Sequence, residues 1–332
     1  METSAQYYIG IDVSSQKFDV AWLKNTTRFT YRNKVLANSP KGCVEFIQWI
    51  RKHVTTELDK VHIVMEPTGV YHELPAYFLH DQGIRISIVN PAYISDYAKS
   101  LGSLHKTDKG DSQVIARFGY ERKPKAWQPE AKSVRELKAK LGRLDALKAD
   151  LQREDNRLSV ANLSRVPDEF MLSIHQIRNA LAQSIADLEQ DVRDHIDKHP
   201  DLKQDITLLQ SIPGVGKETS MRMAVLYRSK QFTKASQMAA FLGLVPKKRD
   251  SGKHKGKVML SKRGNGHMRA LLYFPAVCAS RYNPDIKVHC TRMLSRNKVK
   301  MQAVGAAMRK LVHICFGVLK HQTVYQPRVD FA

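Results

Sequence analysis

Four acidic residues in the first third of the chain stand where their carboxylates could act together. Asp12 ends an apolar stretch that alternates like a strand, and Glu66 ends a second stretch before a Pro-Thr-Gly turn. Asp108 and Asp111 lie three residues apart where a helix should begin, so they share one helix face. Carboxylates gathered together repel one another unless a cation holds them, and Mg²⁺ takes oxygen ligands of this kind. The sequence therefore predicts a Mg²⁺ site, with Mn²⁺ as an alternative, suited to phosphodiester chemistry.

Each of these acids also has an ordinary explanation. An aspartate at a strand end is often a turn former. An Asp-x-x-Asp pair at a helix start is more often a cap or a partner of the helix dipole. The metal hypothesis therefore depends on the four acids acting as one set.

A serine in a strongly basic stretch is the second candidate group. Lysines and arginines on both sides of Ser251 would hold a phosphodiester and stabilise charge that develops on it. A hydroxyl there is a candidate nucleophile, and a Ser-Gly turn in a basic loop is the plainer alternative. The basic residues that we expect to bind nucleic acid here are Lys247, Lys248, Arg249, Lys253, Lys255, Lys262 and Arg263.

A Pro-Gly-Val-Gly turn between two helical stretches is the third motif, and it predicts a helix-hairpin-helix. Gly214 and Gly216 would let backbone N–H groups approach a DNA phosphate, and the next helix adds the positive end of its dipole. Lys217 follows the turn and would add a positive charge. Such a motif binds the nucleic-acid backbone, whereas a plain helical turn would bind nothing.

We expect three regions that position these groups: a catalytic domain over residues 1–128, a helical region over 129–204 and a C-terminal domain over 205–325. In the first region, three strand-like stretches precede alternating helices and strands, which predicts a mixed α/β sheet with helices on its faces. The expected strands lie near residues 7–13, 18–23, 28–35, 61–66 and 84–89, and the expected helices near 41–53 and 71–82.

The helical region carries two apolar stripes at spacings of three and four residues, from Val134 to Leu151 and from Ile174 to Ile196. Such stripes predict two long helices. A break around residues 162–167 would let the helices fold back on each other, as an intramolecular hairpin or within a dimerising coiled coil. The C-terminal domain is expected to be mostly helical.

Positive charge is concentrated in the C-terminal part. The chain holds 54 Lys and Arg against 32 Asp and Glu, and from Asp205 onward these counts are 24 and 5. Nucleic acid is the usual polyanion that neutralises such a surface, and a merely solubilising surface is the alternative. No apolar run approaches the ~18 residues of a membrane span. The four cysteines form no CxxC pair, so we expect a cytoplasmic, nucleoid-associated protein with reduced thiols.

The order and spacing of these motifs resemble the insertion sequence 110 family of transposases, also called DEDD transposases, and the related Piv-type DNA invertases. The resemblance covers roughly Tyr7 to Leu319, and it is specific only when its motifs are taken together. The matching stretches are Tyr8–Asp12, Glu66–Gly69, Asn90–Pro91, Lys106–Asp111, Ile212–Gly216, Phe241–Pro246, Ser251–Gly252 and Ser261–Asn265.

The resemblance implies a role for each matched residue. The family's metal-binding acids fall in a RuvC-like (ribonuclease H-like) domain, and its nucleophilic serine falls on Ser251 in a C-terminal transposase domain. Ser112 departs from the family pattern, in which alanine commonly follows the last aspartate, but it is not a ligand position. The acids fall on Asp12, Glu66, Asp108 and Asp111.

The resemblance also implies partners. Members cleave and rejoin the DNA of an insertion element, and some are guided by a structured bridge RNA from that element. They form dimers or tetramers through the helical region, and one chain's acids then join another chain's serine.

Two rival functions remain open from the sequence. A structure-selective nuclease, similar to a Holliday-junction resolvase, would use the four acids with water as the nucleophile. A non-catalytic nucleic-acid-binding protein would need only the basic half and the helix-hairpin-helix. The first rival leaves Ser251 without a purpose, and the second makes the acidic set a coincidence.

Overall fold

The chain divides into two compact units, residues 1–129 and 130–332. The structure, a computed structural model, gives the backbone alone for residues 108–109, 250–251 and 254–255. None of its described helices is long and apolar enough to cross a membrane. The described residues are 5–102, 108–164, 166–230, 232–247, 250–251, 254–255, 259–261 and 263–328.

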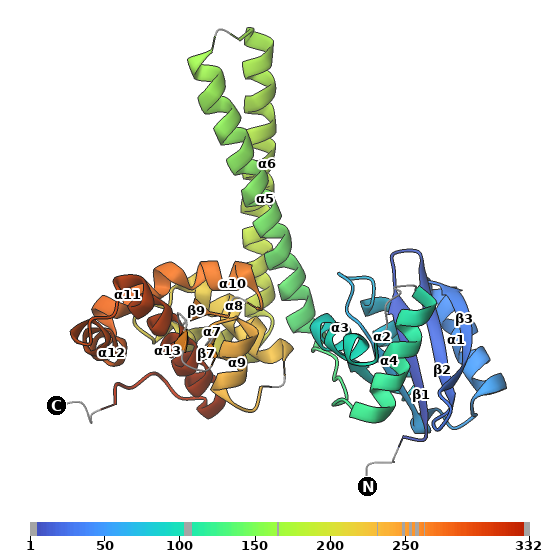
Figure 1. Cartoon of the computed structure of the whole chain (residues 1–332). Coiled ribbons are helices and arrows are strands. Elements are labelled where there is room, and N and C mark those ends of the chain that lie inside the picture. The colour runs from blue at the N-terminus through green and yellow to red at the C-terminus, as the bar shows by residue number, and fades with distance from the viewer. Residues whose placement is uncertain are drawn as a thin grey trace. The chain divides into compact units, whose positions relative to one another are not determined.

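The first unit is built on a five-stranded mixed sheet (Figure 1). The strand β1 pairs antiparallel with β2 and parallel with β4, while β3 and β5 form the edges. The predicted mixed sheet with helices is therefore confirmed. In spatial order the strands are β3 (Thr30–Ala37), β2 (Lys17–Asn25), β1 (Tyr7–Val13), β4 (Val61–Met65) and β5 (Arg85–Ile88).

Helices cover both faces of this sheet, and alternation along β1 decides which residues meet which helices. Ile9 and Ile11 lie in an apolar cluster with residues of α1 and α2. Tyr8 points the other way, and its ring meets that of Tyr120 on α4 edge-on, with centroids 5.5 Å apart. The helices of this unit are α1 (Pro40–His53), the short η1 (Leu58–Lys60), α2 (Glu73–Asp81), α3 (Pro91–Ser100) and α4 (Asp108–Arg122).

A buried histidine takes part in hydrogen bonds that connect the sheet to the last residues of this unit, near Lys125. The ring nitrogen Nε2 of His62 on β4 lies 2.8 Å from the hydroxyl of Ser87 on β5, within a hydrogen bond. The Ser87 hydroxyl also donates a hydrogen bond of 2.8 Å to the carbonyl oxygen of Lys125. Burial, and then the charge of Arg85, lowers the pKa of His62 to about 4. His62 is therefore neutral at pH 7 and acts as a packing and hydrogen-bonding group.

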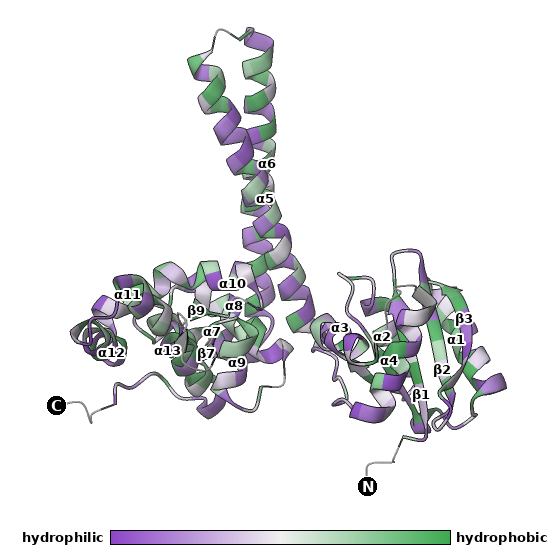
Figure 2. Ribbon diagram, viewed as in Figure 1, coloured by the Kyte–Doolittle hydropathy of each residue, from purple (hydrophilic) through white to green (hydrophobic). Residues whose placement is uncertain are grey.

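The second unit begins with two long helices that pack along each other, α5 (Lys132–Leu163) and α6 (Asp168–Asp197). At the base of the pair, the end where α5 begins, Leu137 and Leu141 are buried in the core of the unit. Towards the tip, Figure 2 shows mixed hydropathy, and Leu163 is 92% exposed. The two stripes thus form helices as predicted, within one chain.

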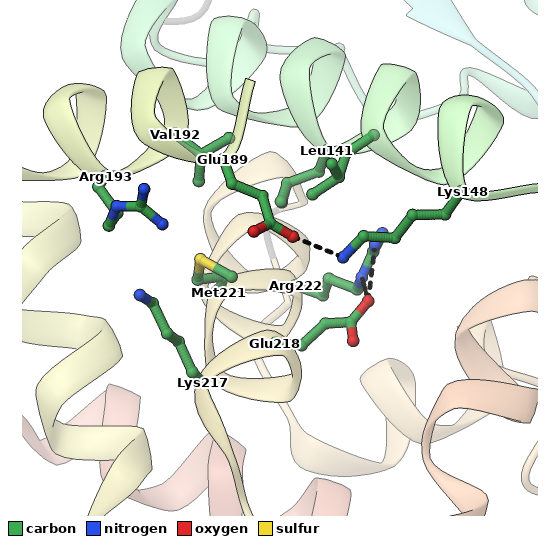
Figure 3. Close-up of a pocket in the computed structure, with 10 residues that line it drawn as sticks. Leu141, Lys148, Glu189, Val192, Arg193, Lys217, Glu218, Met221 and Arg222 are labelled. Atoms are coloured by element: carbon green, nitrogen blue, oxygen red, sulfur yellow. Dashed lines mark hydrogen bonds and ion pairs between the residues drawn. The ribbon is translucent and has the colours of Figure 1, made fainter. Parts of the chain in front are cut away.

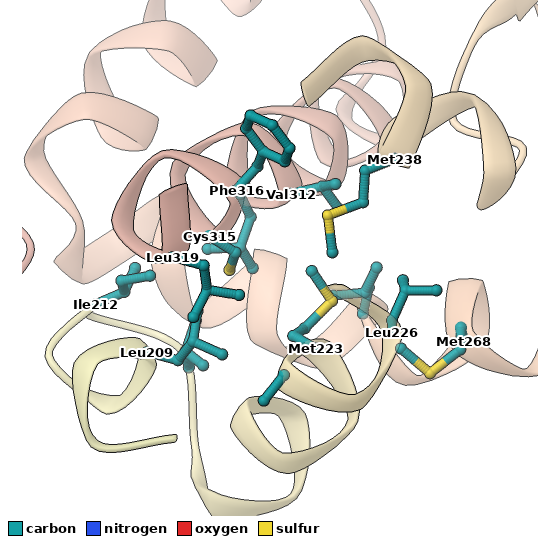
Figure 4. Packing of buried hydrophobic residues seen from close by; sticks show 14 of the residues in the cluster. Leu209, Ile212, Met223, Leu226, Met238, Met268, Val312, Cys315, Phe316 and Leu319 are labelled. Carbon is teal, nitrogen blue, oxygen red and sulfur yellow. The ribbon is translucent and has the colours of Figure 1, made fainter. Parts of the chain in front are cut away.

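The remaining helices pack around α13, which supplies buried residues such as Leu311 and Cys315 (Figure 4). Side chains from α7, α8 and α9 meet it in one apolar cluster. The bounds are α7 (Pro200–Gln210), α8 (Lys217–Ser229), α9 (Ala235–Phe241), α10 (Gly266–Leu271), α11 (Tyr273–Tyr282), α12 (Pro284–Ser295) and α13 (Lys300–His321).

Two small strand pairs interrupt this helical unit between α9 and α10. The strand β6 (Pro246–Lys247) pairs with β9 (Met259–Leu260), and β7 (Asp250–Ser251) pairs with β8 (His254–Lys255). We assigned no strands here from the sequence, because two-residue ladders are too short to show the alternation that marks a strand.

Candidate active site

The strand β1 and the helix α4 touch at a glycine. A Cβ atom built on Gly10 would lie 2.1 Å from the carbonyl oxygen of Ser112 and 2.3 Å from the backbone nitrogen of Ala116. No side-chain rotation can relieve a contact with helix backbone. Only glycine therefore allows this approach, which is the close backbone contact that glycine often marks within a strand.

A second glycine fixes the direction of the helix. A Cβ atom on Gly119 would lie 2.7 Å from Cγ2 of Val64 and 3.7 Å from Cδ1 of Tyr8. The later part of α4 thus lies beside the start of β1, and the earlier part lies beside Gly10. The helix and the strand run in opposite directions.

This arrangement brings three of the four positions named by sequence to one end of the sheet. Asp12 lies two residues beyond Gly10, on the same face and about 7 Å further along β1. Asp111 lies one residue before Ser112, and the backbone of Asp108 begins the same helix. Because the helix runs against the strand, its first turn lies towards the same end of the sheet as Asp12.

The fourth acid comes from the neighbouring parallel strand. The last register pair of β1 and β4 is Ile11 with Met65, so Glu66 follows at the level of Asp12. Met65 lies in the cluster on the α1 face, and alternation turns Glu66 to the α4 face. Asp12, Glu66 and Asp111 are all half-buried.

The donor set fits a hard divalent cation, because all four residues are carboxylates and Mg²⁺ prefers oxygen ligands. The side chain of Asp108 lies outside the described residues. Among the side chains that the structure does describe, no three His, Cys, Asp or Glu groups are disposed to hold a metal ion. The fit therefore stands on the backbone positions and on donor chemistry.

The structure adds two residues that the sequence reading missed. Asp19 on β2 is the register partner of Asp12, so both side chains face the α4 side. Asp19 is 8% exposed, and its carboxylate lies 3.1 Å from the ammonium of Lys17. The signal was present in the sequence, since a short turn that places Val13 opposite Phe18 also places Asp12 opposite Asp19.

The candidate nucleophile lies on a small ladder in the second unit. Ser251 pairs with His254, and Asp250 pairs with Lys255. Lys247, at the start of this region, is exposed, as is Arg263 after it. The positions named by sequence that lie outside the described residues are Lys248, Arg249, Lys253 and Lys262.

The two glycines of the turn between α7 and α8 have different surroundings. Gly214 has φ +98°, and a Cβ atom on it would lie 2.8 Å from the backbone nitrogen of Ala279 on α11. Packing and backbone conformation therefore account for Gly214. Gly216 caps α8, is exposed and would have open space around a Cβ atom, so a phosphate can approach Gly216 and Lys217.

A pocket beside this turn gathers charged side chains from α5, α6 and α8 (Figure 3). Lys217 and Arg193 line one side, while Lys148 pairs with Glu189 at 2.8 Å. That hydrogen bond, with the charges of Lys148, Arg193 and Lys217, holds the pKa of Glu189 below its ordinary value. The pocket thus keeps positive charge at the start of α8.

A buried arginine ties the long helix pair to α8. Arg222, 7% exposed, donates to the carboxylates of Asp145 on α5 and Glu218 on α8. Asp145 also lies 3.1 Å from His267 at the start of α10. The base of the helix pair is therefore joined to the element that follows the Ser251 ladder.

Known proteins resemble this chain over nearly its whole length. Residues 9–164 match a family model described as "Transposase", and residues 206–290 match one described as "Transposase IS116/IS110/IS902 family". The pilin gene-inverting protein of Moraxella lacunata is 33% identical over 330 residues, which are 97% of this chain and 98% of that protein. The transposase for insertion sequence element IS1111A of Coxiella burnetii is 23% identical, over 96% of this chain and 91% of that protein.

Among solved structures, Thermus thermophilus RuvC in complex with a Holliday junction substrate is similar to part of the chain. The match covers 36% of this chain and 98% of the RuvC chain. The sequence identity is 10% and the TM-score is 0.26.

Proposed function

The chain belongs to the IS110 family of transposases, and on that premise we propose that it cleaves and rejoins the DNA strands of a mobile element through an acidic metal site and a serine nucleophile. The first unit would be the RuvC-like domain that holds the metal. The second would bind nucleic acid and carry the nucleophile.

The observation that carries the proposal is the glycine contact between β1 and α4. It supports the proposal because Asp12 and the first turn of α4 lie towards one end of the sheet and Glu66 follows β4 at the same level. Four carboxylates from three elements would repel one another there unless a cation held them. Asp12, Glu66, Asp108 and Asp111 would hold Mg²⁺, or Mn²⁺ in its place, which would stabilise charge on the attacking and leaving oxygens.

The chain's own basic residues would hold the substrate. Lys17 lies on the same face as Asp12 and is positioned by Asp19 at 3.1 Å, so its ammonium can reach a phosphate near the acids. The exposed side chains of Lys217 and Arg263 would bind the strands in the second unit.

Ser251 would attack the phosphodiester. Its oxygen would form a bond to phosphorus as the bond from phosphorus to a sugar oxygen breaks. The serine proton would pass to a base, and the leaving sugar oxygen would take up a proton to become a hydroxyl. The product would be a phosphoserine link between protein and DNA. Such a link keeps the energy of the broken bond, so religation needs no ATP.

A nicked suicide substrate on a denaturing gel tests this chemistry directly. Wild-type protein with Mg²⁺ should give DNA that migrates with protein, and Ser251→Ala should bind DNA but give no adduct. Ser261→Ala, which changes a nearby serine in the same basic region, is the matched control and should still give the adduct. Cleaved DNA that runs free of protein, with Ser251→Ala equally active, would assign the chain to the water-using nucleases.

Two further parts of the proposal concern partners. A structured RNA from the element itself would guide target choice, and the basic C-terminal part is compatible with RNA as well as DNA. The long helix pair would join chains into a dimer or a tetramer, because apolar side chains such as Leu163 and Leu172 are exposed towards its tip. Sequencing RNA from the purified complex, and mixing Asp12→Ala with Ser251→Ala protein, test these two ideas separately.

A further inference from the structure

An aromatic stripe on α11 faces solvent instead of the core. Phe274 is 78% exposed and Tyr282 is 70% exposed, with the exposed Cys278 between them. The three residues stand four apart and so follow one another along the same side of the helix. The opposite side carries Ala276 and Ala279, which are fully buried. The two rings thus lie outside the core of this unit, and the ring of Phe274 lies edge-on to that of its neighbour Tyr273, with centroids 5.3 Å apart.

The stretch of chain that carries the stripe, residues 266–328, is rich in positive charge. Between Gly266 and Arg328 the chain has eleven Lys and Arg and a single acid, Asp285. That acid is 8% exposed, and its carboxylate accepts a hydrogen bond of 2.8 Å from Tyr325. Arg281, on the stripe's own side of α11, is exposed. Within the described residues 266–328, the stripe is therefore accompanied by basic side chains and by no exposed carboxylate.

The other side of α11 packs against the turn between α7 and α8. A Cβ atom on Gly214 would lie 2.8 Å from the backbone nitrogen of Ala279, which is on the buried side of the helix, opposite the stripe. The stripe therefore faces away from the core without being covered by this turn.

We propose that Phe274 and Tyr282 form a stacking surface for unpaired nucleobases, with the exposed Arg281 holding a phosphate of the same strand. The rings stand eight residues apart, about 12 Å along the helix axis, so each contacts a different base. Exposed aromatic rings in a basic setting stack well on bases of any sequence. Paired bases hide their faces inside the duplex, so the ligand is single-stranded.

A second copy of this chain fits the stripe less well, because it would bring its own basic surface against this one. The inference rests on the proposed function in one respect: strand exchange exposes unpaired bases that the stripe can hold. Unpaired bases occur both in opened DNA and in RNA loops, and both present the same ring faces.

Fluorescence anisotropy with the full-length protein tests the proposal. The probes are oligothymidylate, oligouridylate and a DNA duplex of the same length. Phe274→Ala and Tyr282→Ala should each weaken single-strand binding about tenfold, since stacking contributes ~1–3 kcal/mol per base. Duplex binding should change less than twofold. Tyr282→Phe keeps the ring and should bind like the wild type.

Phe170→Ala is the matched control, because Phe170 is an aromatic residue on α6 that is 50% exposed. It should leave single-strand binding unchanged. The two homopolymers separate the sources: a loss for thymidylate alone indicates opened DNA, a loss for uridylate alone indicates RNA, and a loss for both indicates a shared surface.

Three results would overturn the inference. The first is no loss with either alanine variant, and the second is an equal loss for duplex and single strand. The third is a fall in molecular mass by analytical ultracentrifugation in Tyr282→Ala, which would assign the stripe to contact between copies. The proposed function fails independently, if the wild type shows no strand cleavage while its single-strand binding still depends on the rings.

Discussion

The two units differ in how they would serve the proposed chemistry. The first carries 17 Lys and Arg against 13 Asp and Glu, and it places its acids through close backbone contacts between a strand and a helix. The part of the second unit from Asp205 onward carries 24 against 5, with its basic side chains spread over turns, short ladders and exposed helix faces. Metal chemistry depends on positions held within a fraction of an ångström, whereas phosphate binding depends mainly on net charge.

Substitution of one of the four acids should separate the two units most clearly, because it should affect cleavage and not binding. Glu66→Ala should abolish strand cleavage, a loss of several powers of ten, because a ligand to a charge-stabilising cation has gone. Nucleic-acid affinity and its salt dependence should stay within twofold of the wild type, since the proposal assigns most phosphate contacts to the second unit. Cleavage gels and anisotropy titrations measure the two properties on the same protein.

Glu45→Ala is the control for that substitution. Glu45 is exposed on α1, which covers the opposite face of the sheet, and the variant should cleave normally. Near-normal activity in Glu66→Ala and in Asp12→Ala would show that the acidic set has been assigned wrongly.

The glycine contact should give the next largest effect. Gly10→Ala forces a methyl group into helix backbone, which costs about 1–3 kcal/mol or more. Because all three tryptophans, Trp22, Trp49 and Trp127, lie in the first unit, intrinsic fluorescence during urea unfolding follows that unit alone. Cleavage should fall with stability in this variant.

Gly142→Ala is the matched control in the second unit. Gly142 lies within α5, and an added methyl group there would have nothing within 4 Å, so alanine should stabilise the helix by about 1 kcal/mol. Circular dichroism at 222 nm would follow this change, because it reports helix. Equal tryptophan-detected midpoints for Gly10→Ala and the wild type would mean that β1 and α4 do not need their close contact.

The smallest effect should come from removing a single charge. Lys217→Ala should weaken binding several-fold, by a similar factor for unrelated DNA sequences, because the proposal assigns this side chain to phosphates and not to bases. The slope of log affinity against log salt should fall by about 0.9 if one phosphate contact is lost. Lys52→Ala, an exposed lysine on α1, should leave affinity unchanged. A strong sequence dependence of the loss would contradict the backbone-binding role.

The sequence alone determined the strands of the first unit and the two long helices, and it predicted the kind of chemistry. Alternation and spacing identified the strands from β1 to β5 and the two long helices, because side-chain periodicity is a local property that burial imposes directly. Residue type indicated carboxylate and phosphate chemistry, since Mg²⁺ and phosphate select ligands by charge and hardness.

Only the tertiary structure decided how these residues meet. The register of β1 with β2 brought Asp19 and Lys17 beside Asp12, and the bare backbone of Gly10 showed why α4 can approach. Packing against Ala279 separated the role of Gly214 from that of Gly216, which look alike in the sequence. The aromatic stripe on α11 could not be predicted from the sequence either, because residue type does not tell whether an aromatic side chain is buried or exposed. Contacts between distant segments depend on packing geometry, which local periodicity does not encode.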